Sequence, residues 1–368
     1  MSTVPDPSLT PVIPPPPGIT PNFDNPPTLM PVFIAGTIII HFFTIPFLVA
    51  RLFAIIFVTR AVKLEDYLCY LSYLGCIAYT VAIAYTETIG LARHMWDVSY
   101  AMLPDILRLC NVVFCCYTAT GGLAKAVVFL QLKRIFTTAH REVVFWVIIG
   151  SLIVNCVFYI IMLFLYVFTC WPREKIWNPM IEGTCLDSNK LNMAMGTLNV
   201  ISDVQAFALP AWAIWKLNME FRRKISVFAV FGVGAVAVAI GCVGLYYRVI
   251  LLQQADFTWL LTQAGLICMA ELNIVIIVGC CPYVPRVLRH TTSMSTSPSS
   301  GAKNSYTYKH GSSFKSKLNT FNKYMGPDAG ISKLGTEPGS EERLEMHRYA
   351  EESGIVKTTL VSQSVAPK

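Results

Sequence analysis

Seven separate apolar runs, each long enough to cross a membrane, constrain this chain more than any other feature. The runs cover about residues 31–58, 64–90, 103–131, 143–169, 191–216, 225–252 and 258–281. A bilayer core of about 30 Å needs roughly 20 mostly apolar residues in an α-helix. Charged residues, prolines or both separate neighbouring runs. The sequence therefore predicts an all-α fold, a seven-transmembrane helix bundle over residues 31–289, with disordered termini.

The composition supports a membrane-spanning body. Hydrophobic residues make up 54% of the 368 residues and charged residues 14%, whereas soluble domains contain about 45–50% and about 25%. The mean hydropathy is +0.53. A soluble enzyme, a disulfide-rich secreted domain and a nucleic-acid-binding protein all fit this composition poorly. The lipid bilayer is the expected partner, and no nucleic acid is expected.

The two ends of the chain differ from the body. Residues 1–30 are rich in proline, which favours extended structure, and we expect a disordered extracellular tail there. Residues 290–368 are rich in Ser, Thr and Lys without apolar periodicity, as in a disordered cytosolic tail. Eight of residues 291–300 are Ser or Thr. That cluster is either a solvated linker or a group of phosphorylation sites.

The distribution of Lys and Arg predicts the orientation, because cytoplasmic loops carry an excess of both. With the N-terminus outside, eleven such residues lie on the inner side: Arg60, Lys63, Lys133, Arg134, Arg141, Lys216, Arg222, Arg223, Lys224, Arg286 and Arg289. Five lie on the outer side: Arg93, Arg108, Arg173, Lys175 and Lys190. We expect an extracellular or lumenal N-terminus, a cytosolic C-terminus, and the plasma membrane rather than an internal membrane.

Several functions of seven-span proteins lack the residues they need. A retinal Schiff base requires a lysine in the seventh run, and residues 258–281 contain none. The six histidines are scattered, with no i, i+3 or i+4 pair to hold a metal. No Ser/His/Asp grouping or phosphate-binding glycine loop is visible. We expect no catalytic residue, no metal, no cofactor and no enzymatic activity.

Two of the twelve cysteines have a distinct position. Cys170 and Cys185 bracket the loop before the fifth run, on the expected outer and oxidising side. A disulfide between them would hold that loop over the mouth of the bundle, although Cys110 is a competing partner for either one. The other cysteines lie in the runs or at their ends, as small apolar side chains do.

Ionisable residues inside the runs are costly, so each needs a partner or a function. Counting about 1.5 Å per residue from the inner ends places Lys125 roughly 12 Å deep, Glu271 roughly 15 Å and Asp203 roughly 20 Å. Lys125 is expected to pair with Glu271, with Asp203 one turn farther out. Arg248 lies near the depth of Glu87. These charges either fix the helix register or line a polar pocket or switch.

A second charge cluster flanks the first inner turn. Arg51, Arg60, Glu65 and Asp66 surround it. They are expected to join the first two helices, or else to contact a cytosolic partner. The basic inner face reflects topology and attraction to anionic lipid, or docks a cytosolic signalling partner.

The chain resembles the fungal rhodopsin-domain family of integral membrane proteins from about Arg51 to Arg289. The matching motifs, in order, are Leu64-Glu65-Asp66-Tyr67, Gly90-Leu91-Ala92-Arg93-His94-Met95-Trp96, Lys125, Leu132-Lys133-Arg134-Ile135-Phe136, Cys170-Trp171-Pro172, Trp177, Gly183, Cys185, Asn199, Asp203, Pro210, Leu217, Arg223-Lys224-Ile225, Arg248, Glu271 and Pro282. Glu65 replaces the first Asp of the family's usual Asp-Asp pair, and the cysteine-rich extracellular domain of some receptor-like members is absent.

The resemblance implies a function of the satratoxin-cluster or pathogenicity-receptor type. One expectation is a receptor-like protein that senses a small-molecule ligand and signals to a cytosolic partner. The alternative is an accessory membrane protein of a secondary-metabolite gene cluster, acting in transport, sensing or scaffolding. A membrane enzyme has little support. The sequence names neither a ligand nor a G protein.

Overall fold

The computed structural model describes residues 6–137, 142–178, 180–215 and 221–295, all within one compact unit that ends at Pro298. The described residues contain seven long helices and a short eighth. Their bounds are α1 Met30–Phe53, α2 Leu64–Thr86, α3 Leu103–Thr137, α4 Glu142–Val167, α5 Ser188–Trp215, α6 Phe221–Gln253, α7 Phe257–Cys280 and α8 Val284–Ser295. The predicted all-α bundle of seven long helices is confirmed.

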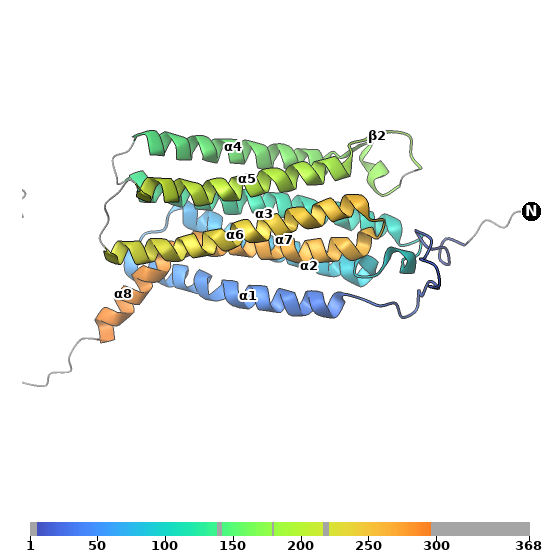
Figure 1. The fold of residues 1–368 in the computed structure, drawn as a ribbon, viewed down its shortest axis with the longest axis horizontal. Helices are drawn as coiled ribbons and strands as arrows, with labels where there is room; N and C mark the ends of the chain where they lie inside the picture. Colours follow the sequence, from blue (N-terminus) through green and yellow to red (C-terminus); the bar gives the residue numbers. More distant parts are fainter. Residues whose placement is uncertain (1–5, 138–141, 179, 216–220, 296–368) are drawn as a thin grey trace, which may run out of the picture. The chain divides into compact units, whose positions relative to one another are not determined.

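The helices lie side by side in one bundle (Figure 1). α7 is the central helix, in contact with α1, α2, α3 and α6. At one end, the strands β1 (Cys170–Trp171) and β2 (Thr184–Cys185) form an antiparallel hairpin. At the other end, α8 leaves the bundle at an angle (Figure 1). We call these the hairpin end and the α8 end.

Six of the seven long helices are apolar and long enough to cross a membrane within the described residues. The exception, α5, carries polar side chains that turn towards its neighbours. Ser202 donates to Asn155 on α4 at 2.5 Å, and Gln205 donates to Ser151 at 2.6 Å. Large apolar side chains such as Phe42 on α1 are exposed instead. The bundle thus buries polar groups and presents apolar surface, as a bilayer requires.

Local signals explain where α2 begins and ends. The Asp66 carboxylate accepts the Lys63 backbone N–H at 2.9 Å, which satisfies a free donor before the first turn. Two wider π-helical turns extend the helices at Ala54–Thr59 and Glu87–Leu91. Gly90 lies in the second of these segments, and its φ of +141°, a conformation that favours glycine, comes just before the helical segment ends at Leu91.

The N-terminal tail is more ordered than the sequence suggested. Residues 6–29 fold back over the hairpin end. The Val12 N–H donates to the Val98 carbonyl at 3.1 Å, and the Tyr100 N–H donates to Thr10 at 2.9 Å. Leu29 donates to Ala92 at 3.0 Å. The prediction of a disordered tail over residues 1–30 is wrong for this segment, because the loop after α2 supplies backbone partners that composition cannot reveal.

The predicted cytosolic tail begins later than expected. α8 continues through the first residues assigned to the tail and ends at Ser295. Its Val287 side chain packs against a small cluster of Ala54, Ile55 and Tyr283. Residues 296–368, and with them the rest of the Ser/Thr cluster, lie outside the described residues.

Candidate functional site

An ion pair lies in the centre of the bundle. Lys125 on α3 donates a hydrogen bond from Nζ to Oδ1 of Asp203 on α5, and both side chains are buried. The expected pairing of Lys125 with Glu271 is wrong. Counting residues gives only the depth of the backbone, and a lysine stem is long enough to reach a partner at another level. The second Asp203 oxygen, Oδ2, has no hydrogen-bond partner among the described residues.

Glu271 on α7 has partners of its own. Tyr117 on α3 donates its hydroxyl to Oε2 of Glu271 at 3.1 Å. Asn199 on α5 donates its side-chain amide to Oε1. The Asn199 carbonyl oxygen in turn accepts the Tyr159 hydroxyl at 2.6 Å. Both carboxylate oxygens are therefore satisfied inside the bundle, which explains why a buried acid is tolerated there.

Arg248 on α6 completes the central group. Its Nη2 donates to the Tyr117 hydroxyl at 3.2 Å, so this hydroxyl joins Arg248 to Glu271. The guanidinium also lies over the Tyr117 ring, 5.7 Å from its centroid. The group, which we call the core network, contains two basic and two acidic side chains: Lys125, Arg248, Asp203 and Glu271. Their formal charges cancel, which lowers the cost of burial in lipid.

Glu87, which the sequence grouped with Arg248, lies apart from the core network. It is the first residue of the π-helical segment Glu87–Leu91, which follows α2 at the hairpin end, and its side chain is buried. Neither carboxylate oxygen has a hydrogen-bond partner in the described part of the chain. The nearby Thr262 hydroxyl donates instead to the carbonyls of Leu91 and Thr258. The expectation that Arg248 and Glu87 share one network is wrong.

Three cavities surround the core network. One, about 700 Å³ with its open mouth, occupies the hairpin half of the bundle; we call it the hairpin cleft. The aromatic and polar residues on its wall are Tyr79, Phe114, Tyr117, Tyr166, Asn192 and Arg248. A central cavity of about 190 Å³ touches Glu271 and Lys125. A third, of about 510 Å³, touches Lys125 and Asp203 and extends to Leu132; we call it the α8-side cavity.

Glycines clear the space that the core network occupies. A Cβ at Gly196 would lie 2.6 Å from Cδ of Arg248, and one at Gly244 would lie 3.2 Å from its Nη1. A Cβ at Gly241 would lie 3.3 Å from Oδ2 of Asp203. Sequence analysis missed these positions. The signal that the sequence offered was a glycine at each of these three positions in an otherwise apolar run. The structure shows that a charged side chain lies against each glycine.

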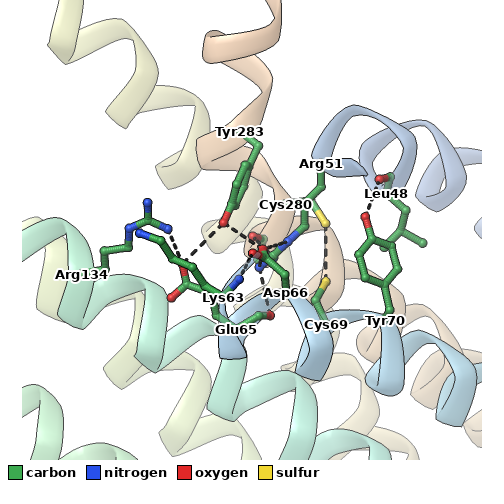
Figure 2. Close-up of polar contacts among 11 residues, drawn as sticks. Leu48, Arg51, Lys63, Glu65, Asp66, Cys69, Tyr70, Arg134, Cys280 and Tyr283 are labelled. Atoms are coloured by element: carbon green, nitrogen blue, oxygen red, sulfur yellow. Dashed lines mark hydrogen bonds and ion pairs between the residues drawn. The ribbon is translucent and has the colours of Figure 1, made fainter. Parts of the chain in front are cut away.

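The cluster at the first inner turn forms a second buried charge group, shown in Figure 2. Arg51 donates to Oδ1 of Asp66 from Nε at 3.1 Å and from Nη2 at 2.8 Å. It also donates to the backbone carbonyls of Gly279 at 2.9 Å and Glu65 at 3.0 Å. Arg51 is 0% exposed. This one guanidinium therefore joins α1, α2 and α7 at the α8 end.

Two residues that the sequence did not assign complete this inner-turn cluster. Arg134 on α3 donates to Oε1 of Glu65 at 2.5 Å. Tyr283, directly after α7, donates to Oδ1 of Asp66 at 3.0 Å and lies 3.5 Å from Glu65 (Figure 2). Arg60, which was expected in the cluster, is exposed and forms no ion pair with Glu65 or Asp66. Arg60 directly follows the π-helical segment Ala54–Thr59 and has a φ of +50°. This backbone conformation ends the helix and directs the chain into the turn.

The expected disulfide is present. Cys170 and Cys185 are bonded and lie opposite each other in the hairpin register. Cys110, the competing partner, is a buried free thiol. Gly183 is required in the loop, since a Cβ there would lie 2.4 Å from the Trp171 carbonyl oxygen. The Arg108 guanidinium of α3 lies 5.5 Å from the Trp177 ring centroid and holds the loop on the bundle.

A histidine clamp also closes the hairpin end. The His94 ring stacks between Trp96 and Trp259, with centroid distances of 4.3 and 3.8 Å. Its Nδ1 lies 2.6 Å from Oδ2 of Asp256, the residue that precedes α7. The sequence singled out the segment around His94 only as part of a family resemblance. The stacking partner Trp259 is too distant in sequence for local pattern to reveal it.

Comparison with known proteins assigns the family. The model of the fungal rhodopsin domain matches residues 50–290. This range includes α2 to α7 in full and only the last residues of α1. The chain belongs to the fungal rhodopsin domain family. The Cys170–Cys185 hairpin, the core network and the inner-turn cluster all fall within the matched region. No solved structure matches the chain.

Three curated relatives are similar over parts of the chain. A SAT4 family membrane protein of Emericella nidulans is 26% identical over 238 residues, 62% of this chain and 59% of the relative. Fugralins biosynthesis cluster protein 2 of Gibberella zeae is 27% identical over 56% of this chain and 52% of the relative. Satratoxin biosynthesis SC1 cluster protein 4 of Stachybotrys chartarum is 31% identical over 38% and 50%. The chain thus spans roughly half to three fifths of the length of these relatives.

Proposed function

We propose that this member of the fungal rhodopsin domain family is a non-enzymatic, receptor-like protein that binds a small molecule in the hairpin cleft. The observation that carries the proposal is Arg248. It lines a largely apolar cleft and forms no ion pair with a carboxylate in the described residues. Mostly apolar pockets with a few convergent polar groups suit small ligands.

The lining indicates the chemistry of the ligand. Tyr79, Phe114 and Tyr166 offer aromatic surface, and Asn192 offers an amide. A guanidinium recognises planar carboxylates through paired hydrogen bonds. The cleft is therefore suited to a flat, mostly apolar molecule that carries a carboxylate or a similar anionic oxygen. A neutral form of the same molecule would offer the guanidinium no direct carboxylate partner.

The hairpin end is proposed to face the outside of the cell. Disulfides persist in oxidising compartments, and the Cys170–Cys185 bond is at this end. The basic residues Lys63, Lys133 and Arg289 lie at the α8 end, as expected for a cytosolic face. An N-terminal epitope tag should be accessible on intact protoplasts, and a C-terminal tag only after permeabilisation. The reverse result would place the cleft on the cytosolic side.

Ligand binding can be tested by thermal unfolding of the purified protein in lipid nanodiscs. The probes are a panel of flat aromatic carboxylic acids and their methyl esters. A ligand present at about 100 times its Kd stabilises the folded state by about 2.7 kcal/mol. We expect at least one acid to raise the unfolding temperature and its ester to have no such effect.

Variants then assign the anionic contact. Arg248→Gln should abolish the stabilisation by the acid, whereas Arg173→Gln, which removes an exposed arginine at the same end, should retain it. An equal shift from acid and ester, or an unchanged shift in Arg248→Gln, would exclude Arg248 as the anchor. If no member of the panel shifts the unfolding temperature, the proposed ligand class is wrong.

The names of two relatives favour a second candidate function. They refer to fugralins and satratoxin biosynthesis clusters. Under this alternative, the protein is an accessory membrane protein of a secondary-metabolite cluster and handles its product by transport, sensing or scaffolding. Deleting the gene should then change the ratio of secreted to retained metabolite. A receptor would instead change transcription of the neighbouring genes in response to added ligand, with that ratio unaltered.

A further inference from the structure

The three cavities of the bundle form a series. Tyr117 lines both the hairpin cleft and the central cavity. Lys125 and Val275 line both the central cavity and the α8-side cavity. Each cavity therefore adjoins the next across one or two side chains, and together they extend from Asn189 at the start of α5 to Leu132 near the end of α3. The series therefore runs along most of the length of α3.

The side chains at the two junctions are polar or ionisable. Tyr117 separates Arg248 in the hairpin cleft from Glu271 in the central cavity. Lys125 separates Glu271 from Asp203, whose Oδ1 it contacts. The free oxygen of Asp203, Oδ2, is on a residue that lines the α8-side cavity. An apolar core that only seals the bundle requires no such row of polar and ionisable side chains.

We propose that this series is a proton path across the bundle, with Glu271 and Asp203 as the two groups that carry the proton. The central cavity, which Glu271 and Lys125 line, has space on the order of one water molecule. A water there would bridge Glu271 to the Lys125–Asp203 pair. Lines of carboxylates inside membrane helices are the usual form of proton relays. The inference is independent of the proposed ligand function, because it requires no ligand.

The transfer balances without any other reactant. The Tyr117 O–H bond breaks as its proton forms an O–H bond on Glu271, and Tyr117 takes a replacement proton from a hydronium ion in the hairpin cleft, which becomes water. The O–H bond on Glu271 breaks as the proton moves through the bridging water to Asp203, and Glu271 returns to its carboxylate form. Asp203 then releases the proton to water in the α8-side cavity. One proton crosses, and no electron is exchanged. The same steps run in reverse when the driving force reverses.

The charges of the core network select against other ions. Arg248 contacts Tyr117 at the first junction and Lys125 forms the second, and each of these cations would repel a metal cation. Glu271 and Asp203 would repel a small anion between them. A proton avoids both obstacles, since it crosses as part of a neutral carboxyl group. The central cavity has space on the order of one water molecule, which is too little for a hydrated ion.

Proteoliposomes provide the test. The full chain is reconstituted with a pH-sensitive dye inside, and a valinomycin-driven potassium gradient supplies the potential. We expect the wild-type protein to move protons faster than protein-free liposomes, and Glu271→Gln to slow this flux by about 100-fold, the scale expected when a positioned proton-transfer group is lost. Glu87→Gln is the matched control, since Glu87 is a buried carboxylate outside the three cavities.

Two results would overturn the proposal. One is a wild-type flux equal to that of empty liposomes, and the other is a Glu271→Gln flux equal to wild type. If Glu271→Gln fails to fold, Tyr117→Phe replaces it, because that change keeps every charge and removes only the hydroxyl at the first junction. A folded Tyr117→Phe with slowed flux supports the path, and one with unchanged flux refutes it. A negative flux result leaves the ligand test intact, and the reverse also holds.

Discussion

Lys125 on α3 and Asp203 on α5 form a buried ion pair in the middle of the bundle, and the other Asp203 oxygen has no hydrogen-bond partner in the described residues. The pair fixes the distance between two helices that otherwise make few contacts with each other. It also places a lysine beside Glu271 without neutralising it directly, since Tyr117 and Asn199 satisfy that carboxylate.

Removing one member of the pair should be more damaging than removing both. Lys125→Met leaves the Asp203 carboxylate buried without a counter-charge, which typically costs about 3–5 kcal/mol. We expect Lys125→Met to reduce accumulation in the membrane sharply and Lys125→Met with Asp203→Asn to recover part of it. Accumulation is measured by fluorescence-detected size-exclusion chromatography.

Two further variants make this experiment decisive. Lys190→Met removes an exposed lysine, whose side chain is 87% exposed, and should accumulate normally. Lys125→Met with Glu271→Gln should not recover, because it leaves Asp203 unpaired. Recovery by the Glu271 double variant instead of the Asp203 one would contradict the observed pairing.

The inner-turn cluster predicts that arginine cannot be replaced by lysine at position 51. The Arg51 guanidinium donates to the Asp66 side chain and to two backbone carbonyls at once. A lysine is a point charge and cannot reproduce this planar arrangement. Arg51→Lys and Arg51→Met should both lower the unfolding temperature in nanodiscs. Arg60→Met, at an exposed position, should change the free energy of unfolding by no more than about 0.5 kcal/mol. Equal stability of Arg51→Lys and wild type would mean that only the charge matters.

The disulfide should stabilise the hairpin end. Cys170 and Cys185 are 15 residues apart, and closing a loop of that length contributes about 3 kcal/mol in the chain-entropy estimate. Replacing both with serine should lower the unfolding temperature, while Cys242→Ser, at an exposed free thiol, should not. Non-reducing digestion and mass spectrometry should recover the 170–185 linkage. A peptide that joins Cys110 to either residue would exclude the pairing.

The glycines of the core network should be intolerant of a methyl group. In Gly196→Ala the new Cβ would lie 2.6 Å from Cδ of Arg248 and would displace the guanidinium. Overpacking of this kind typically costs about 1–3 kcal/mol. Gly150→Ala on α4 is the control, because no atom lies within 4 Å of its Cβ position, and alanine there should stabilise the helix slightly. Similar unfolding temperatures for the two variants would show that Arg248 relaxes at no cost.

The seven-helix architecture followed from the sequence because a bilayer imposes one strong rule. Any segment that crosses it must be helical, about 20 residues long and mostly apolar, and such segments are visible without tertiary information. The Cys170–Cys185 bond was also predictable, because its two cysteines lie 15 residues apart on one expected outer loop. Lys125, Asp203, Glu271 and Glu87 are buried in the structure, and each was visible in the sequence because a charged residue inside an apolar run is conspicuous.

The partners of those charges depended on the tertiary structure. Which of Asp203 and Glu271 receives Lys125 is decided by helix rotation, tilt and the reach of each side chain, and a residue count along separate helices measures none of these. Tyr117 and Tyr283 carry no charge and have no local signal, although each donates to a buried carboxylate. Asn199 was visible only as part of the family resemblance, which did not reveal its contact with Glu271. Likewise, residues 6–29 became ordered only because the loop after α2 presented backbone groups to them. The bilayer determines the helices from sequence, whereas specific contacts between distant segments determine the site.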